Sequence, residues 1–179
     1  MIGVRRLSFA VAACLTLATA AQAEILDSQV GGFTVRETRV IAAPVSKVWE
    51  GLVQPAAWWS SDHTFSHDAR NLSLEVRPGG EWRETLPGGG GARHMVVVYA
   101  APPSALRLEG ALGPLQAMGV VGHLTFTLKD QGGATLITET YDAGGHAQGG
   151  LDKLAPPVDG VLDAQLGRLK AYVETGKTP

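Results

Sequence analysis

The chain has 179 residues and only one cysteine, Cys14. Cys14 lies in an N-terminal segment that we expect to be removed, so the mature chain is predicted to have no cysteine. This absence excludes a disulfide, a thiolate metal site and a cysteine nucleophile from the mature protein. We expect neither a metal ion nor another cofactor.

Basic residues are few and scattered. The chain has 15 Lys and Arg against 17 Asp and Glu, and removing Arg5 and Arg6 leaves 13 basic residues and a net charge of −4. Binding to nucleic acid needs a patch of Lys and Arg that neutralises phosphates. The sequence shows no such patch, so a nucleic-acid partner is not expected.

The first 23 residues have the order of a secretory signal peptide: basic residues, an apolar run over 7–20, and the small-x-small site Ala21-Gln22-Ala23. We expect export to the periplasm or the outside, with cleavage after Ala23. Two alternatives are an uncleaved anchor and a lipoprotein acylated at Cys14, although the sequence stays apolar after Cys14. No later segment is long and apolar enough to span a membrane.

The remaining sequence predicts one α+β domain over residues 33–176, preceded by a lead-in over 24–32. A strand over 33–42 is followed by two short helices that begin at Pro44 and Pro55. About six strands follow between residues 72 and 141, and short Gly and Pro clusters separate them. A long helix over 158–174 closes the domain. Its expected buried stripe includes Leu162, Leu166 and Leu169.

This order, together with several local motifs, resembles the START-like superfamily, which is also called SRPBCC or the helix-grip fold. The similarity includes the branch named after the heat-shock-protein ATPase activator and the polyketide-cyclase-like branch. The motifs are Ala43-Pro44, Val48-Trp49 with Leu52, Pro55 with Trp58-Trp59, Pro78-Gly79-Gly80 before Glu81-Trp82, Gly133-Ala134-Thr135-Leu136, and Leu166 with Leu169 and Tyr172.

The resemblance implies a curved antiparallel sheet of about seven strands that wraps around the C-terminal helix, with a cavity between sheet and helix. It also implies a small apolar or amphipathic ligand. Some members of the superfamily catalyse cyclisation or dehydration, but no shared catalytic motif can be carried over to this chain. The fold alone therefore does not assign a reaction.

The candidate cavity residues are aromatic side chains and apolar residues of the predicted strands, the final helix and the loop over 112–121. An exposed loop seldom contains so many large apolar residues, so we expect this loop to cover a cavity. The candidates are Trp58, Trp82, Tyr99, Leu115, Met118, Phe126, Ile137 and Leu166.

Two groups of side chains are candidates for acid–base chemistry. Asp62, His63 and His67 follow the tryptophan pair, and the four-residue spacing of the histidines would place them on one face of a helix; the alternative is a solvated loop. Glu139 and Tyr141 share a strand face with Ile137. They can act on a ligand only if that face is the inward one.

Three functions are compatible with these patterns: ligand binding in an internal cavity, a cyclase-like or lyase-like enzyme using the same cavity, and a protein-interaction module of the cell envelope. An exposed apolar patch around Trp58 and Trp59 would favour the third function. The sequence does not determine the oligomeric state.

Overall fold

The computed structural model describes residues 22–179. The predicted signal segment, apart from its last two residues, and Cys14 lie outside this range. The elements in chain order are β1 (Gln22–Gln29), β2 (Gly32–Ile41), α1 (Val45–Leu52), α2 (Pro55–Trp58), η1 (Ser61–His63), η2 (Ala69–Asn71), β3 (Leu72–Leu74), β4 (Glu81–Thr85), η3 (Pro87–Gly89), β5 (Gly91–Ala101), β6 (Ala105–Gly110), η4 (Gly113–Ala117), β7 (Gly119–Asp130), β8 (Thr135–His146) and α3 (Ala155–Thr175).

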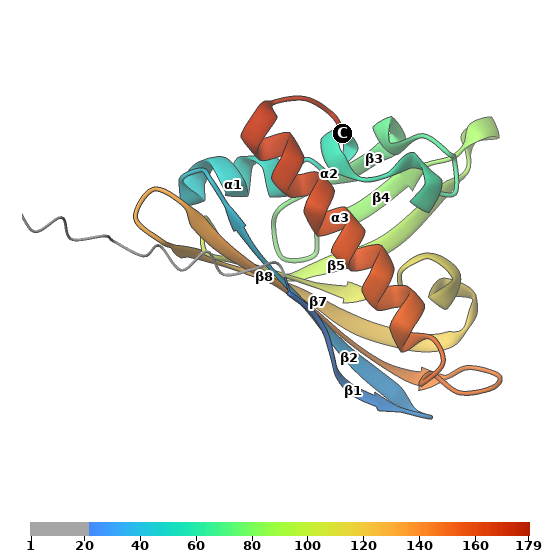
Figure 1. Cartoon of the computed structure of the whole chain (residues 1–179). Coiled ribbons are helices and arrows are strands. Elements are labelled where there is room, and N and C mark those ends of the chain that lie inside the picture. Colours follow the sequence, from blue (N-terminus) through green and yellow to red (C-terminus); the bar gives the residue numbers. More distant parts are fainter. Residues whose placement is uncertain (1–21) are drawn as a thin grey trace, which may run out of the picture.

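The strands form one curved sheet in the order β1-β2-β8-β7-β6-β5-β4-β3, and all neighbouring strands are antiparallel. Helix α3 lies across one face of the sheet, and α1 and α2 lie near its C-terminal end (Figure 1). This arrangement confirms the helix-grip fold. Among residues 22–179, no helix is both long and apolar enough to cross a membrane.

The sheet has eight strands instead of about seven, because the expected lead-in forms strand β1. This strand makes a hairpin with β2, with Ile25 opposite Val35 and Gln29 opposite Gly32. The side chains of residues 23–30 are exposed. A strand that is held by backbone pairing at a sheet edge, without a buried face, lacks the apolar alternation by which strands are recognised in a sequence.

Helix α3 begins at Ala155, three residues before its predicted start. The sequence Pro156-Pro157 falls in its first turn. Prolines are tolerated there because the N–H groups of the first turn have no partner within the helix. The expected stripe is buried, with Leu162, Leu166 and Leu169 each at most 1% exposed.

Strand β8 turns the face of Ile137, Glu139 and Tyr141 towards the helix, and these three side chains are at most 2% exposed. Strand β2 turns its odd-numbered residues inward, including Glu37 and the partly buried Arg39. These two inward polar residues explain why the apolar alternation of β2 does not reveal which face is buried. The core therefore contains ionisable groups beneath α3.

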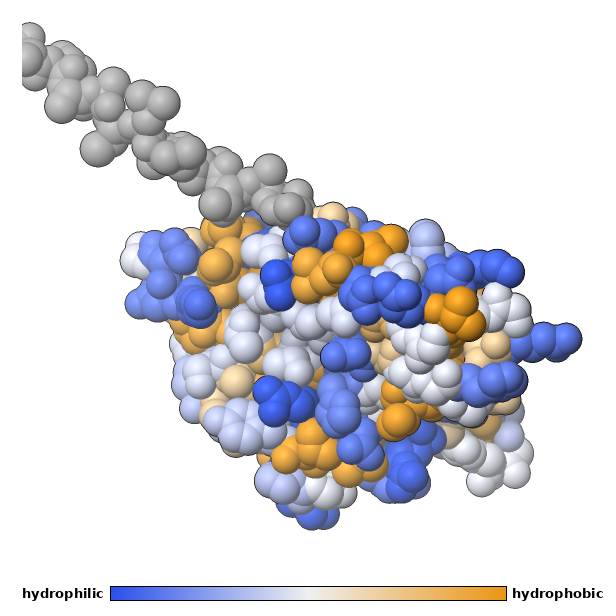
Figure 2. All heavy atoms as spheres, turned by 90° about the horizontal axis from the view of Figure 1, so that it is seen from below, coloured by the Kyte–Doolittle hydropathy of each residue, from blue (hydrophilic) through white to orange (hydrophobic). Residues whose placement is uncertain are grey.

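The hydrophobic side chains left on the surface do not form one continuous patch in the view from below (Figure 2). Hydrophobic residues occupy several separate areas among hydrophilic ones on that face. Trp58 and Trp59 are 2% and 6% exposed, so the exposed apolar patch around them that would favour a protein-interaction module is not on the surface. They stack edge to face in the core instead, with ring centroids 5.5 Å apart.

Candidate functional site

A pocket of about 410 Å³ lies between the N-terminal half of α3, strands β4 and β5, and the segments 59–65 and 112–118. From the helix side it is lined by Val158, Val161 and Leu162. The volume is within the range of pockets that hold small molecules. The lining is mainly apolar, which favours a ligand that leaves water readily.

Two tryptophans form the aromatic part of the pocket wall. Trp59 and Trp82 contact each other edge to face, with ring centroids 4.9 Å apart, and both line the pocket. The indole Nε1 of Trp59 donates a hydrogen bond to the carbonyl oxygen of His63 at 3.0 Å. This bond links the aromatic wall to the turn η1, where the histidine lies.

Three of the eight candidate cavity residues line this pocket: Trp82, Leu115 and Met118. Trp58 and Phe126 instead border a second hollow of only about 10 Å³, behind Trp82. That hollow is at the lower limit for a single water molecule.

The other three candidates do not line the pocket. Ile137 and Leu166 are at most 1% exposed and fill the core between the sheet and α3. Tyr99 is 48% exposed, and the guanidinium of Arg107 lies 5.8 Å from its ring centroid. The pairing of β5 with β6 shifts register between Val97 and Tyr99, and this irregularity turns Tyr99 away from the core although Val97 is buried.

Of the three candidates that follow the tryptophan pair, two lie at the pocket and one does not. Asp62 and His63 are in the turn η1 and lie at the rim of the pocket. His67 is exposed, does not line the pocket and has φ 56°. The segment is a loop with short 3₁₀ turns, so the four-residue spacing of the histidines does not place them on one helical face.

His63 contacts helix α3 through a buried amide. Gln165 is 1% exposed, and its Oε1 accepts a hydrogen bond from the backbone N–H of Ser60 at 2.8 Å. Its Nε2 lies 3.3 Å from Nδ1 of His63. Because Oε1 is already an acceptor, the amide NH₂ is the donor to His63, and the proton of the neutral imidazole is then on Nε2.

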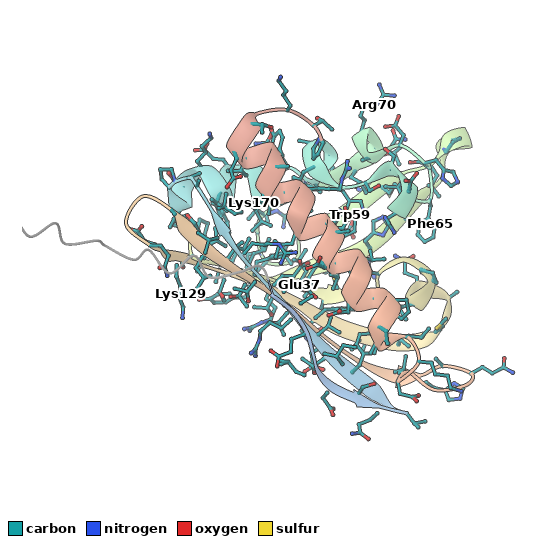
Figure 3. The ribbon with its side chains drawn as sticks, in the orientation of Figure 1. Glu37, Trp59, Phe65, Arg70, Lys129 and Lys170 are labelled. Carbon is teal, nitrogen blue, oxygen red and sulfur yellow. The ribbon has the colours of Figure 1, made fainter. Side chains whose placement is uncertain are left out.

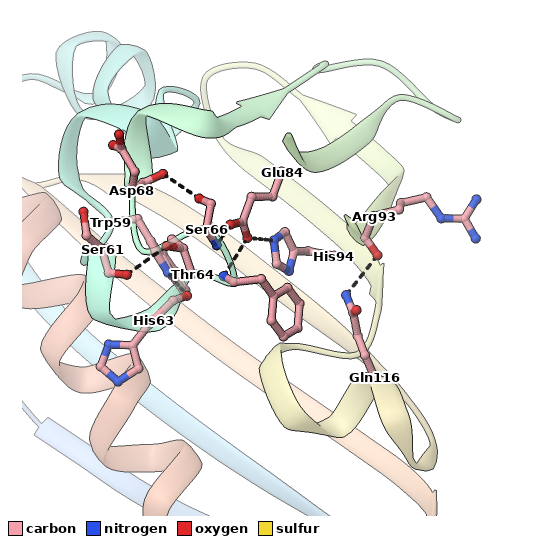
Figure 4. A network of polar contacts seen from close by, with 11 residues as sticks. Trp59, Ser61, His63, Thr64, Ser66, Asp68, Glu84, Arg93, His94 and Gln116 are labelled. Atoms are coloured by element: carbon pink, nitrogen blue, oxygen red, sulfur yellow. Dashed lines mark hydrogen bonds and ion pairs between the residues drawn. The ribbon is translucent and has the colours of Figure 1, made fainter. Parts of the chain in front are cut away.

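A buried carboxylate–imidazole pair lies on the opposite wall. Oε2 of Glu84 on β4 is 3.0 Å from Nε2 of His94 on β5. The carboxylate also accepts backbone N–H bonds from Phe65, at 3.1 Å, and from Ser66. Glu84 and His94 are 1% and 7% exposed, and their side chains face each other (Figure 4). The ring of Phe65 stacks on the imidazole with centroids 5.6 Å apart.

The surroundings of this pair set its charge state. Burial raises the pKa of Glu84, but the hydrogen bonds from Ser66, Phe65 and His94 outweigh it, and the pKa is lowered below 4.5. Burial lowers the pKa of His94 below 6.5 although Glu84 opposes this shift. At neutral pH the pair is therefore a carboxylate and a neutral imidazole, with the imidazole proton on Nε2.

Neither Glu84 nor His94 was among the candidates from the sequence. One signal was present for Glu84, because it shares a strand face with Trp82. No comparable signal marked His94, because its inward orientation depends on the register between β4 and β5, which shifts by one residue between Trp82 and Arg83. Pairing across strands brought the two residues together.

Glu139 and Tyr141 lie on the inward face of β8 but do not line the pocket. Glu139 is opposite Glu37 of β2, and Glu37 lies close to α3 (Figure 3). Burial, followed by contact with Asp159, raises the pKa of Glu37 to about 8, and burial raises that of Glu139 well above 4.5. Burial also raises the pKa of Tyr141 to about 12.

The carboxyl groups under α3 do not form a metal site. Among residues 22–179, no three or more His, Cys, Asp or Glu side chains are arranged to hold a metal ion. Burial instead favours the neutral form of Glu37 and Glu139, and for Glu37 the nearby Asp159 adds to this shift.

A family model described as "Polyketide cyclase / dehydrase and lipid transport" matches residues 32–174. The chain belongs to this family. It is an SRPBCC domain of the polyketide-cyclase-like branch, a class that includes ligand-binding and cyclase-like domains. No curated protein matches the chain.

Solved structures share the fold at low sequence identity. EF2215 from Enterococcus faecalis, a conserved protein of unknown function, is 19% identical, with 90% of this chain and 81% of that chain covered and a TM-score of 0.59. The solution structure of CalU16 from Micromonospora echinospora is 16% identical, with 89% and 77% covered and a TM-score of 0.58. These two similarities concern the fold alone.

DynU16, a protein in the dynemicin biosynthetic locus, is 26% identical to this chain, with a TM-score of 0.55. The match covers 80% of this chain but 48% of DynU16. The chain thus corresponds to about half of that protein.

Proposed function

We propose that the chain binds a small apolar or amphipathic molecule in the pocket of about 410 Å³ beside α3. The observation that carries this proposal is the lining: two tryptophans and several aliphatic side chains surround the space, and the few polar groups are Asp62, His63, Thr64 and His94. Removal of apolar surface from water drives binding, at about 25 cal/mol per Å² before the costs of association. The polar groups would orient the ligand.

The test is a titration with N-phenylnaphthylamine, a small amphipathic fluorophore whose emission rises in an apolar site. Val161 lines the pocket and is partly buried, so Val161→Trp fills part of the space. We expect it to weaken probe binding about tenfold, equivalent to ~1.4 kcal/mol. The matched control is Ala164→Trp on the exposed side of the same helix.

Wild-type affinity in Ala164→Trp with weakened binding in Val161→Trp supports the pocket as the site. Equal affinities in both variants, or no binding by the wild type, contradict the proposal. Circular dichroism spectra of both variants check that the fold is retained.

A second candidate is an enzyme that uses the same pocket. The observation that favours it is the buried carboxylate–imidazole pair Glu84–His94, of which His94 lines the pocket. A buried base beside an apolar space is a common arrangement in sites that move protons.

We also propose that the chain is exported and cleaved after Ala23. The support is the order of basic, apolar and small-x-small segments in residues 1–23. Mass spectrometry of the protein from a bacterial host would then show a chain that begins at Glu24 in the periplasmic fraction. A chain that begins at Met1, or one acylated at Cys14, contradicts this proposal.

A further inference from the structure

The first two turns of α3, residues 155–162, lie between the pocket and a group of buried carboxyls. Val158 and Val161 line the apolar space. Asp159 lies beside Glu37 of β2, and Asp163 follows one turn later on the same helix face. Residues three or four apart share a helix face, so the valines and the aspartates form two separate flanks. One short segment therefore forms a wall of the pocket and covers the carboxyl groups.

Glu37 is fully buried under this segment. Its side chain is 0% exposed, and neither carboxyl oxygen makes a hydrogen bond within residues 22–179. Oδ1 of Asp159 is buried in the same way. Burial without a hydrogen bond disfavours the charged form of a carboxyl group, and a second carboxyl group nearby adds to this effect. The closed contact between α3 and β2 is therefore stable with Glu37 neutral.

The groups around Glu37 come from its own strand and from three neighbouring elements. They are Arg39 of β2, Glu139 of β8, Ala23 of β1, and Asp159 and Asp163 of α3. The cation among them, Arg39, already pairs with Asp163. A negative charge on Glu37 is therefore poorly compensated while the helix is in place.

The two ends of α3 are attached to the sheet differently. At the C-terminal end, where Lys170 lies (Figure 3), its Nζ donates to the carbonyl oxygen of Val40 at 2.7 Å. Oε1 of Glu174 accepts from the backbone N–H of Ala42 at 2.8 Å. At the N-terminal end the N-cap residue is Leu154, whose side chain cannot accept a hydrogen bond. The first turns therefore depend more on packing than the last turns do.

We propose that residues 155–162 are a pH-dependent gate over the pocket, closed while Glu37 is protonated and opening when Glu37 ionises. Opening lets water reach the carboxylate and withdraws Val158 and Val161 from the ligand. The inference rests on the proposed binding function and adds the regulation of that site.

The direction of the response follows from the two forms. Burial raises the pKa of Glu37 to about 8 in the closed form, and the pKa returns towards 4.5 once water reaches the carboxylate. Between these values opening releases a proton, so the opening constant rises with pH by up to about tenfold per unit and levels off above about pH 8. A neutral ligand that needs the closed wall binds more weakly over the same range.

The test of the gate is amide hydrogen exchange of the protein without ligand, measured by mass spectrometry between about pH 5.5 and about pH 8 and corrected for the intrinsic rate. We expect the protection of residues 155–162 to fall by up to about tenfold per pH unit. Residues 168–175 are the internal control and are expected to stay better protected at every pH, because the contacts of Lys170 and Glu174 hold them to the sheet.

Two variants assign the response to Glu37. Glu37→Gln keeps the shape of the side chain but cannot ionise, so protection over 155–162 is expected to lose most of its pH dependence. Glu109→Gln is the matched control, because Glu109 is half exposed and pairs with His123 on the neighbouring strand. It is expected to keep the wild-type dependence.

A titration with N-phenylnaphthylamine links the gate to the pocket, because this probe is neutral throughout the pH range. From about pH 6.5 to about pH 8.5 we expect its affinity for the wild type to fall about tenfold relative to Glu37→Gln. His63 and His94 also line the pocket, but both are present in the two proteins, so the difference between the proteins reports Glu37.

The outcomes separate the two proposals. If protection of residues 155–162 does not depend on pH, equals that of 168–175, or has the same slope in Glu37→Gln, the gate is overturned whether or not the probe binds. If protection responds as expected but probe affinity does not, control of the pocket is overturned and ligand binding stands. If the probe binds at neither pH, the binding function is overturned, and with it the regulation of that function.

Discussion

At the scale of single residues, Glu84 joins three parts of the site. Its carboxylate accepts backbone N–H bonds from Phe65 and Ser66 and faces Nε2 of His94. It therefore holds the loop after η1 against β4 and orients the imidazole. Glu84 is 1% exposed, so water cannot replace its carboxylate. Removing the carboxylate would leave the N–H groups that it accepts from without this acceptor.

We expect Glu84→Ala to lower the free energy of unfolding by about 3 kcal/mol, because it leaves buried donors unpaired. Glu81→Ala on the same strand is the control. Glu81 is about one-third exposed and pairs with Arg83 and Arg93 at 3.5 Å, so its loss costs about 1 kcal/mol or less. Chemical denaturation measures both values. Equal losses would show that Glu84 is not a structural link.

At the scale of elements, α3 packs over carboxyl groups that are neutral in the folded protein. Glu37 of β2 has both oxygens buried and without a hydrogen-bond donor, and it faces Glu139 of β8 and Asp159 and Asp163 of α3. Arg39, which pairs with Asp163, opposes the rise in the pKa of Glu37. Ionisation of Glu37 therefore opposes the packing of α3 on the sheet.

The pH dependence of stability follows from this shift. In the unfolded chain Glu37 loses its proton near 4.5, whereas in the folded chain it keeps it up to about 8. The folded state binds more protons between these values, so stability is highest at the low end and falls as the pH rises, by up to about 1.4 kcal/mol per pH unit.

We expect Glu37→Gln to flatten this fall and to be more stable than the wild type at about pH 8.5 but not at about pH 5. Glu109→Gln, at a half-exposed position, is the control. Thermal unfolding across the pH range measures the effect. A wild type whose stability does not fall between these pH values contradicts the neutral state of Glu37.

The elements could be predicted where prolines and alternating side chains mark them. Pro44 and Pro55 precede or begin the short helices, and Leu124, Phe126 and Leu128 mark the inward face of β7. Strand β1 could not be predicted, because exposed side chains carry no periodic signal. The start of α3 was placed too late, because prolines are also common outside helices.

The candidate site could be predicted only in part, because its chemistry depends on register. The aromatic and apolar lining, such as Trp82, Leu115 and Met118, follows from composition and from the unusual apolar loop. The pairing of Glu84 with His94 depends on the alignment of two strands, and a bulge between them decides which side chains meet. Glu139 and Tyr141 were candidates, but they lie under α3 and away from the pocket.

At the scale of the whole molecule, α3 packs tightly near its C-terminal end, and the pocket lies beside its first turns. Near the C-terminal end, Gly51 of α1 approaches so closely that a Cβ there would be 2.6 Å from Cγ2 of Val173. Near the N-terminal end, the space between the helix and the segments 59–65 and 112–118 stays open. Helix α3 therefore combines tight packing against α1 at one end with a cavity at the other.

The most direct test of ligand binding in this pocket is a titration of the ¹⁵N-labelled protein with N-phenylnaphthylamine, followed by the indole N–H signals of its tryptophans. Trp59 and Trp82 line the pocket, whereas Trp49 is on α1 and outside it. We predict that the signals of Trp59 and Trp82 shift together and saturate at one equivalent of probe, while that of Trp49 stays in place. Unchanged signals for Trp59 and Trp82, or an equal shift of Trp49, would contradict binding in the pocket.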